Sequence, residues 1–125
     1  MTENDISYKI SGAIFKVYNT LGPGLLESVY MAALTIELKK EGLTVHTEVP
    51  LPAIYEEHKL DLGFRIDILV NNSVIIEVKS IEKLTEVHHK IVLTYLKLSG
   101  KKLAILVNFK TDDISKSIFR KVNNL

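Results

Sequence analysis

Apolar residues recur at helical spacing in three stretches of the chain. Over residues 5–20 the i, i+3 and i+4 pattern predicts an amphipathic helix, and "LGPG" at 21–24 predicts its end. A second helix should follow and stop at Gly42, with its apolar face at Leu26, Val29, Ala33 and Ile36. A third is predicted over residues 85–98, with its apolar face at Leu84, Val87, Ile91, Tyr95 and Leu98.

Strict alternation of apolar and polar residues predicts strands between the second and third helices. Residues 45–51 alternate, "LPAIYEEH" at 51–58 is typical of a loop or irregular edge, and residues 60–70 alternate most regularly. A shorter partner strand carries Val74, Ile76 and Val78. "LAILVNF" at 103–109 is continuously apolar, which indicates a strand buried on both faces. The segment 114–122 predicts a short helix or an edge strand.

The order of these elements, α-α-β-β-β-α-β, predicts one α/β domain over residues 1–125, with a mixed sheet and helices on both sides. No apolar run is long enough to span a membrane, the N-terminus lacks a signal-peptide pattern, and there are no cysteines. We therefore expect a cytoplasmic protein without disulfides or a cysteine-based zinc site.

The net charge is only +1, but residues 1–80 are net acidic and residues 81–125 net basic. A basic half favours contact with a phosphate backbone, although solvated helix faces would account for the same charges.

Three ionisable residues, Asp67, Glu77 and Lys79, interrupt the apolar strands. On the long strand the even positions are apolar, so Asp67 belongs to the odd face together with Asp61 and Arg65. Pairing position 70 with 74 across Asn71–Ser73 keeps apolar residues opposite apolar ones, and it places Asp67 directly opposite Glu77. Lys79 then lies two residues further along the same face as Glu77.

Opposed carboxylates repel each other, so this arrangement favours a shared proton or a bound cation. Hard oxygen ligands favour Mg²⁺ or Mn²⁺, and a lysine beside them suits phosphodiester hydrolysis. The alternative is a solvated charge ladder in which Arg65 and Lys79 neutralise the two acids. Leu69 and Ile75 share the odd face, which indicates that this face is at least partly covered.

The pattern of an acid at one strand end and acid–x–Lys on the next strand resembles the PD-(D/E)xK nuclease superfamily. Within it, Gly24, Glu27 and Tyr30 in "GPGLLESVY" resemble the "GxxExxY" family. That likeness continues through "FRIDILV", "VIIEVKS", "YLKLSG" and "LVNF", over roughly residues 8–122. The resemblance implies a restriction-endonuclease-like αβββαβ core, with a mixed four-stranded sheet flanked by helices and one extra N-terminal helix.

The resemblance also implies a site. Asp67 and Glu77 would hold Mg²⁺ (or Mn²⁺) with help from Glu27, and Lys79 would orient or activate water. Substrate contacts are expected from Tyr30, Tyr95, His88 and Lys90, with the phosphates followed by basic residues among Lys90, Lys97, Lys101 and Lys102. For the two tyrosines, ordinary core packing is the alternative. One residue departs from the family: Ile91 stands where a glutamine is usual.

Two hypotheses follow from different classes of protein. The first is a Mg²⁺-dependent nuclease acting on DNA or RNA, with Asp67, Glu77, Glu27 and Lys79 as its catalytic residues. The second is a catalytically weak or inactive nuclease fold that binds nucleic acid or a protein partner, which the Ile91 departure favours. A homodimer is plausible for either, because a lone domain of this size cannot easily cut both strands of a duplex.

Overall fold

The computed structural model describes residues 1–125, apart from the side chains of Asp61 and Leu62. The predicted alternation at Leu62 and the predicted side of Asp61 therefore fall outside the described side chains. The elements, in chain order, are α1 (Glu3–Leu21), α2 (Glu27–Lys40), β1 (Val45–Tyr55), β2 (His58–Val70), β3 (Val74–Lys79), α3 (Glu86–Ser99), β4 (Leu103–Asn108), the 3-10 turn η1 (Ile114–Lys116) and β5 (Ile118–Val122).

The five strands of the described backbone form one mixed sheet in the order β1-β2-β3-β4-β5. β3 and β4 run parallel and are joined by α3, whereas the other neighbours are antiparallel. A mixed α/β sheet was predicted, but the prediction of four strands is wrong. The reason is that residues 118–122, within the segment predicted as a short helix or an edge strand, form β5 and pair with residues 103–107 of β4.

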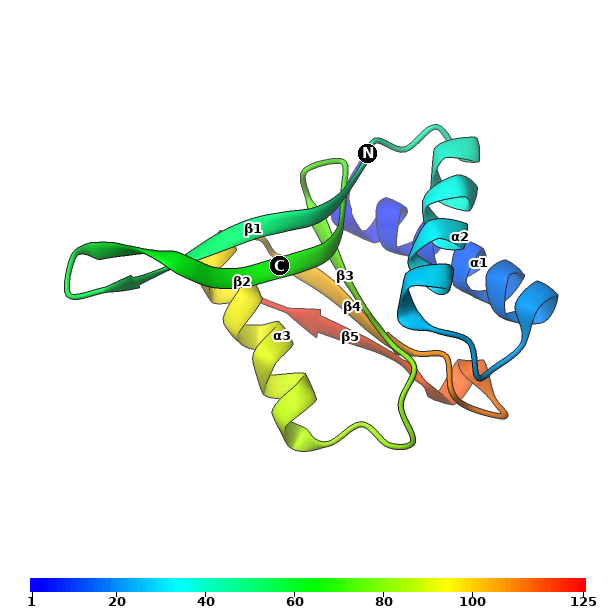
Figure 1. Cartoon of the computed structure of the whole chain (residues 1–125). Helices are drawn as coiled ribbons and strands as arrows, with labels where there is room; N and C mark the ends of the chain where they lie inside the picture. The colour runs from blue at the N-terminus through cyan, green and yellow to red at the C-terminus, as the bar shows by residue number, and fades with distance from the viewer.

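Helices cover both faces of the sheet (Figure 1). One face packs against α1 and α2, and we call it the α1/α2 face; its strand residues are Ile68, Val70, Val74, Ile76, Val78, Leu103, Ile105 and Val107. The other packs against α3, and we call it the α3 face; its buried strand residues are Ile66, Leu69, Ile75, Ala104 and Leu106. Period-two alternation places successive strand residues on opposite faces, so each strand supplies both layers.

The first helix has the predicted core face, because Ile6, Ile10, Ala13, Ile14 and Val17 are all buried. Its N-terminus is a capping box. The Thr2 side chain accepts a hydrogen bond from the Asp5 backbone, and the Asp5 carboxylate accepts one from the Thr2 N–H.

The predicted apolar faces of the other two helices are largely wrong. α2 buries Tyr30, Leu34 and Leu38, whereas the predicted Leu26, Val29 and Ile36 are exposed. α3 buries Val92 and Leu96, whereas Val87, Ile91 and Leu98 are exposed. Both helices carry apolar residues around much of their circumference, so spacing alone does not select the face that packs.

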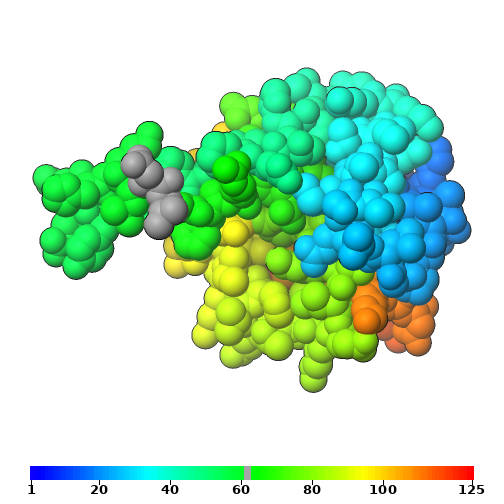
Figure 2. All heavy atoms as spheres, in the orientation of Figure 1, coloured from blue at the N-terminus to red at the C-terminus, as the bar shows by residue number. Residues whose placement is uncertain are grey.

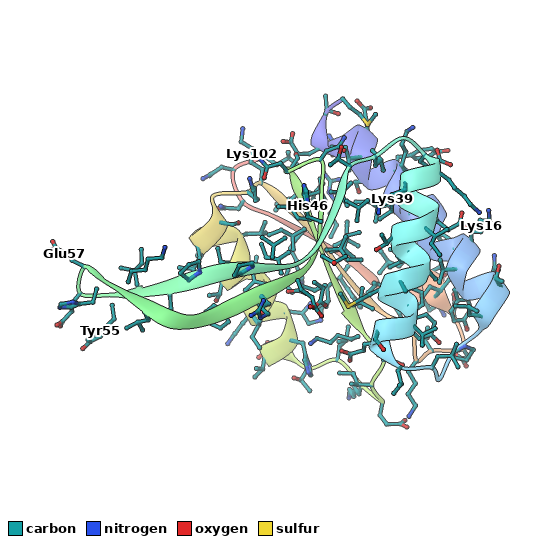
Figure 3. The ribbon with its side chains drawn as sticks, turned by 45° about the horizontal axis from the view of Figure 1, so that its top comes forward. Lys16, Lys39, His46, Tyr55, Glu57 and Lys102 are labelled. Carbon is teal, nitrogen blue, oxygen red and sulfur yellow. The ribbon has the colours of Figure 1, made fainter. Side chains whose placement is uncertain are left out.

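The end of the β1–β2 hairpin extends beyond the helices as an arm, which we define as residues 53–63 (Figures 1 and 2). Tyr55 and Glu57 lie at its far end (Figure 3). Of the two predictions for residues 51–58, the irregular edge is confirmed, because β1 is an edge strand with a register shift between Pro52 and Ile54. The loop shrinks to a two-residue turn at Glu56 and Glu57, both at positive φ, with Tyr55 paired to His58. Two glutamates give no sequence signal for such a turn, which usually contains Asn or Gly.

Gly63 permits the close pairing of the two strands at the base of the arm. A Cβ at this position would lie 2.5 Å from the carbonyl oxygen of Leu51 and 2.9 Å from the Cα of Pro52. Any larger residue would therefore push β1 and β2 apart.

Candidate active site

The central feature of the site is a divergence of β2 from β3. The predicted register is confirmed from Val70–Val74 to Ile68–Ile76, and Asn71 and Asn72 adopt the positive φ of the turn. The ladder then stops, one residue before Asp67 and Glu77, so the predicted continuation to Ile66 and Val78 is wrong.

At the divergence, each carboxylate accepts a hydrogen bond from a backbone N–H of the neighbouring strand. The Val78 N–H donates to Asp67 Oδ2 at 2.8 Å, and the Asp67 N–H donates to Glu77 Oε2 at 3.3 Å. Each acid thus satisfies a backbone donor of the opposite strand. The two carboxyl groups therefore lie between the strands, and their hydrogen bonds help to fix the position of the backbone there.

An irregularity in β1 accompanies this divergence. Glu48 has a φ of 51°, and the pairing of β1 with β2 passes from Thr47–Ile68 to Val49–Ile66 without a pair at Asp67. As a result Ile66 packs on the α3 face with Leu69, not with Ile68 as strict alternation predicts.

Glu77 is only 4% exposed, and Asp67 is half-buried. Burial, followed by the adjacent Asp67 carboxylate, raises the pKa of Glu77 to about 10 against the opposing effects of the Asp67 N–H and Lys79. Among the described side chains, neither acid forms an ion pair with Arg65 or Lys79, and Arg65 instead reaches the Glu48 carbonyl. A neutralised, solvated charge ladder does not fit this environment.

A pocket of about 60 Å³ lies over the acidic pair and is lined by Asp67, Glu77, Lys79, His88, Ile91, Val92 and Tyr95. The space is enough for about two waters, taking roughly 30 Å³ for each. Of the predicted site residues, the pocket gathers Asp67, Glu77, Lys79, His88 and Tyr95. Ile91 also lines it, so the departure from the family pattern lies in the pocket itself.

Two residues of α3 contribute polar groups to this pocket. Burial, together with the charges of Glu77 and Asp67, raises the pKa of Tyr95 to about 12, which keeps its hydroxyl protonated as a donor. The Nδ1 of His88 accepts a hydrogen bond from the Thr85 N–H at 2.9 Å as part of the helix cap. The proton of the neutral His88 ring is therefore on Nε2.

The structure does not bring Glu27 to the acidic pair. Its Oε2 accepts a hydrogen bond from the Ser80 N–H at 3.2 Å, and it lines a different cavity with Ser80 and Lys110. No group of three or more acidic or histidine side chains that could hold a metal occurs within the described side chains. The predicted three-carboxylate set of Asp67, Glu77 and Glu27 is thus not assembled here.

Tyr30 lies in the core, which agrees with the core-packing alternative and not with the predicted substrate contact. Its ring is fully buried and stacks on Phe109 at 4.1 Å between centroids. Its hydroxyl donates to the Gly22 carbonyl at 2.5 Å and accepts from the Leu25 N–H at 3.1 Å, which fixes the loop between α1 and α2.

The basic residues expected to follow phosphates are not grouped at the pocket. Lys90 is exposed and does not line it. Lys101 reaches Asn72, so it and Lys102 lie at the opposite end of β3 and β4 from Lys79. Five residues of strand separate these ends, or about 17 Å at roughly 3.3 Å per residue.

Sequence reasoning missed Asn108, a buried polar residue at the end of β4. It pairs in register with Lys79, and its side chain holds the backbone of Ile81. The sequence feature that could have revealed it is a single amide residue at the end of the otherwise apolar stretch "LAILVN".

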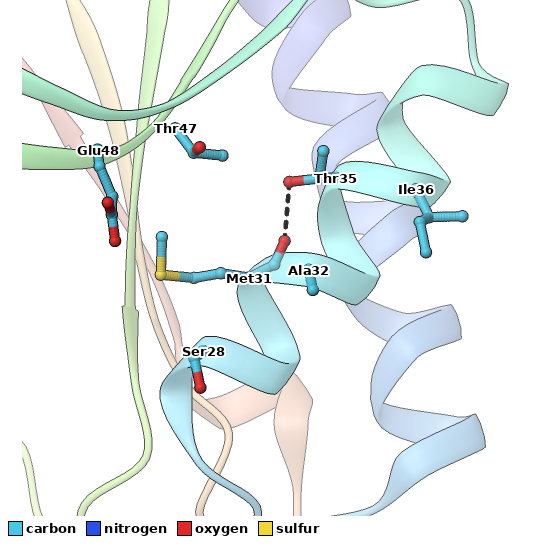
Figure 4. A pocket seen from close by; sticks show the side chains of 7 residues that line it. All are labelled: Ser28, Met31, Ala32, Thr35, Ile36, Thr47 and Glu48. Carbon is cyan, nitrogen blue, oxygen red and sulfur yellow. Dashed lines mark hydrogen bonds between the residues drawn. The ribbon is translucent and has the colours of Figure 1, made fainter.

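A larger cavity of about 430 Å³ lies between α2 and β1 (Figure 4). Its lining is mainly apolar and hydroxyl-bearing, with Met31, Ala32, Ile36, Thr35 and Thr47, and Glu48 is its single ionisable residue. Without grouped ionisable side chains it offers no acid–base or metal chemistry, so the smaller pocket is the better candidate despite its size.

The residues of the smaller pocket fit a divalent metal ion. Mg²⁺ is commonly bound through one or two carboxylates, with waters and substrate phosphates completing its shell. Asp67 and Glu77 supply such a pair, and a cation there would offset both the burial and the Asp67 charge that raise the Glu77 pKa.

Comparison with known proteins agrees with this geometry. The sequence model of the PD-(D/E)XK nuclease superfamily matches residues 4–121. The comparisons with curated proteins and with solved structures returned no match. Among the described helices, none is long and apolar enough to cross a bilayer. The acid at the end of the β2–β3 ladder, the Glu77–Val78–Lys79 strand beside it and the match over nearly the whole chain show that this protein belongs to the PD-(D/E)XK nuclease superfamily.

Proposed function

We propose that the protein is a Mg²⁺-dependent nuclease that hydrolyses phosphodiester bonds in DNA or RNA. The observation that carries this proposal is the pair of carboxyl groups at the divergence of β2 and β3, with the half-buried Lys79 in the same pocket. A fold gains no stability from two adjacent acids, one of which is almost fully buried, so a ligand is the simplest reason for their presence.

The five polar residues of the pocket would divide three roles in this reaction. Asp67 and Glu77 hold the metal ion, which supplies Lewis-acid stabilisation of the negative charge on the phosphate. The ammonium group of Lys79 orients the attacking water and stabilises the developing charge. The Tyr95 hydroxyl and the His88 Nε2–H are donors for phosphate oxygens.

Further features support placing the chain in the "GxxExxY" family. Gly24 has a φ of 91°, Tyr30 fixes the loop that this glycine allows, and Glu27 contacts the strand end beside Lys79. The motif is thus a structural unit that joins α2 to the site. Cleavage of both strands of a duplex would require two copies of this single-site domain.

The proposal is tested by cleavage of fluorescent single-stranded and duplex DNA and RNA, with Mg²⁺, Mn²⁺ or EDTA. We expect metal-dependent cleavage that falls at least about 100-fold in Lys79→Ala and Asp67→Asn, because the first removes the charge at the phosphate and the second removes a group that holds the metal. Lys116→Ala, at a highly exposed lysine on η1, should match the wild type. Cleavage that survives Lys79→Ala would come from a contaminant and would contradict the proposal.

The second candidate is a nuclease fold that binds nucleic acid or a protein without cutting, which Ile91 in the pocket lining favours. Nucleic-acid binding without metal-dependent cleavage in the same assay supports this alternative.

A further inference from the structure

Three hydrogen bonds hold the chain at Lys79 and at the residue directly after it. The Phe109 N–H donates to the Lys79 carbonyl at 2.8 Å. The next residue, Ser80, donates its N–H to Glu27 Oε2 at 3.2 Å and its hydroxyl to the Leu25 carbonyl at 2.6 Å. Contacts from β4 and from the start of α2 therefore meet at the point where β3 ends.

Asn108 holds Ile81, the second residue after Lys79. Its Oδ1 accepts from the Ile81 N–H at 3.0 Å and from the Lys110 N–H at 3.3 Å, and its Nδ2 donates to the Ile81 carbonyl at 2.9 Å. Asn108 is only 5% exposed. A buried amide that satisfies both groups of one peptide residue fixes the chain there, because losing it leaves polar groups unpaired away from water.

We infer that Glu27 and Asn108 are positioning residues for Lys79: they fix the backbone at Ser80 and Ile81, and this orients the lysine toward the acidic pair. This inference rests on the proposed nuclease function. It assigns Glu27 a role other than metal ligand, because its carboxylate is engaged by the Ser80 N–H and does not join Asp67 and Glu77.

Lys79 needs such support because its side chain is long and only half-buried. Lysine carries about 2 kcal/mol of rotamer entropy, so any freedom of its backbone would add to the freedom that its side chain already has. A displacement of about 1 Å in a catalytic group can lower a rate about 100-fold.

The two roles for Glu27 predict different outcomes for a glutamine. Glu27→Gln keeps an oxygen that accepts from Ser80 but removes the negative charge. A positioning role is therefore rescued by glutamine and lost in Glu27→Ala, whereas a ligand role is damaged in both variants.

The experiment compares Glu27→Gln, Glu27→Ala and Asn108→Ala with the wild type. We expect kcat to fall about 10- to 100-fold in the two alanine variants, with KM and the Mg²⁺ concentration for half-maximal rate unchanged. Glu27→Gln should stay within about threefold of the wild type. Asn123→Ala is the matched control, because Asn123 also bonds a backbone carbonyl, that of Lys101, but at the other end of the sheet, and its kcat should not change.

Two measurements do not depend on cleavage. The rise in melting temperature on adding Mn²⁺ should persist in Glu27→Ala and disappear in Asp67→Asn. Hydrogen exchange at the Ser80 amide should accelerate in Glu27→Ala, and exchange at the Ile81 amide in Asn108→Ala, while amides of the α1/α2 face stay protected.

The outcomes separate the inference from the proposed function. A wild-type protein that cleaves no substrate overturns both. A wild type that does cleave, combined with a Glu27→Gln variant as impaired as Glu27→Ala and with no Mn²⁺ shift in either, overturns the positioning role and leaves the nuclease function standing.

Discussion

The α1/α2 face and the α3 face use the same strands but enclose different chemistry. The α1/α2 face buries nineteen residues in one cluster, all of them apolar. The α3 face buries seven in its apolar cluster, and the Glu77 carboxyl group is buried on the same side. The α1/α2 face therefore accounts for most of the hydrophobic stabilisation. On the α3 face, burial of the Glu77 carboxyl group beside Asp67 lowers the stability of the fold.

The largest expected effect is on the packing of the two faces. Leu34 and Leu96 are both fully buried, on the α1/α2 and α3 faces respectively. Replacement of either by alanine should lower the free energy of unfolding by about 2–5 kcal/mol. We expect the larger loss at Leu34 because it belongs to the larger buried cluster. Urea denaturation measures both, and a larger loss at Leu96 would contradict the comparison.

The next prediction concerns the acidic pair, where a substitution should raise the free energy of unfolding. The folded-state pKa of Glu77, about 10, lies above its reference value of 4.5, so folding binds a proton and stability falls as pH rises between these values. Glu77→Gln cannot ionise, and in EDTA it should be more stable than the wild type by about 1–3 kcal/mol near pH 8.

This difference should disappear below pH 4.5, where Glu77 is protonated in both states. Thermal melts over a pH series measure it, with Glu56→Gln on the exposed turn of the arm as the control. A Glu77→Gln variant that is less stable than the wild type at pH 8 would show that the pair is not under strain.

A smaller loss is expected from Tyr30→Phe. The variant keeps the ring stacked on Phe109 but removes the hydroxyl that bonds Gly22 and Leu25. We expect a loss of about 1 kcal/mol, measured by urea denaturation. Tyr8→Phe, at a position that is 83% exposed, should leave stability unchanged.

The smallest effect on stability is expected at the pocket lining. Ile91 is 39% exposed, so Ile91→Gln should change the free energy of unfolding by less than about 0.5 kcal/mol. The added amide gives the pocket a polar group, and we expect the cleavage rate to rise. A slower variant of unchanged stability would show that the apolar side chain itself contributes to the site.

Local patterns in the sequence were enough to predict the acidic pair. Asp67 and Glu77 belong to one hairpin with a short turn, and alternation fixed its register at Val70 and Val74. The divergence beyond Ile68 was not predictable in the same way, since it accompanies the irregularity at Glu48 in β1, nineteen residues away along the chain.

Long-range contacts account for the rest of what sequence reasoning missed. Glu27 meets Ser80 across 53 residues, and Asn108 meets Ile81 across 27. The spacing of apolar residues within a helix or strand does not predict contacts between residues so far apart in the sequence. The prediction of the packing faces of α2 and α3 failed for a different reason. Exposed apolar residues such as Ile36 and Leu98 have the same character as the buried ones, so the sequence does not show which of them pack.

The turn at Glu56 and Glu57 separates Glu27 from the residues that line the acidic pocket. Both residues are exposed, so a break in the peptide bond between them removes no buried contact. The fragment 1–56 contains Glu27, whereas the fragment 57–125 contains Asp67, Glu77 and Lys79. β1 and β2 pair along nearly their whole length, so the two fragments can reassociate through these strands. Cutting the chain at this turn would therefore give a split protein, in which the proposed activity should require both fragments.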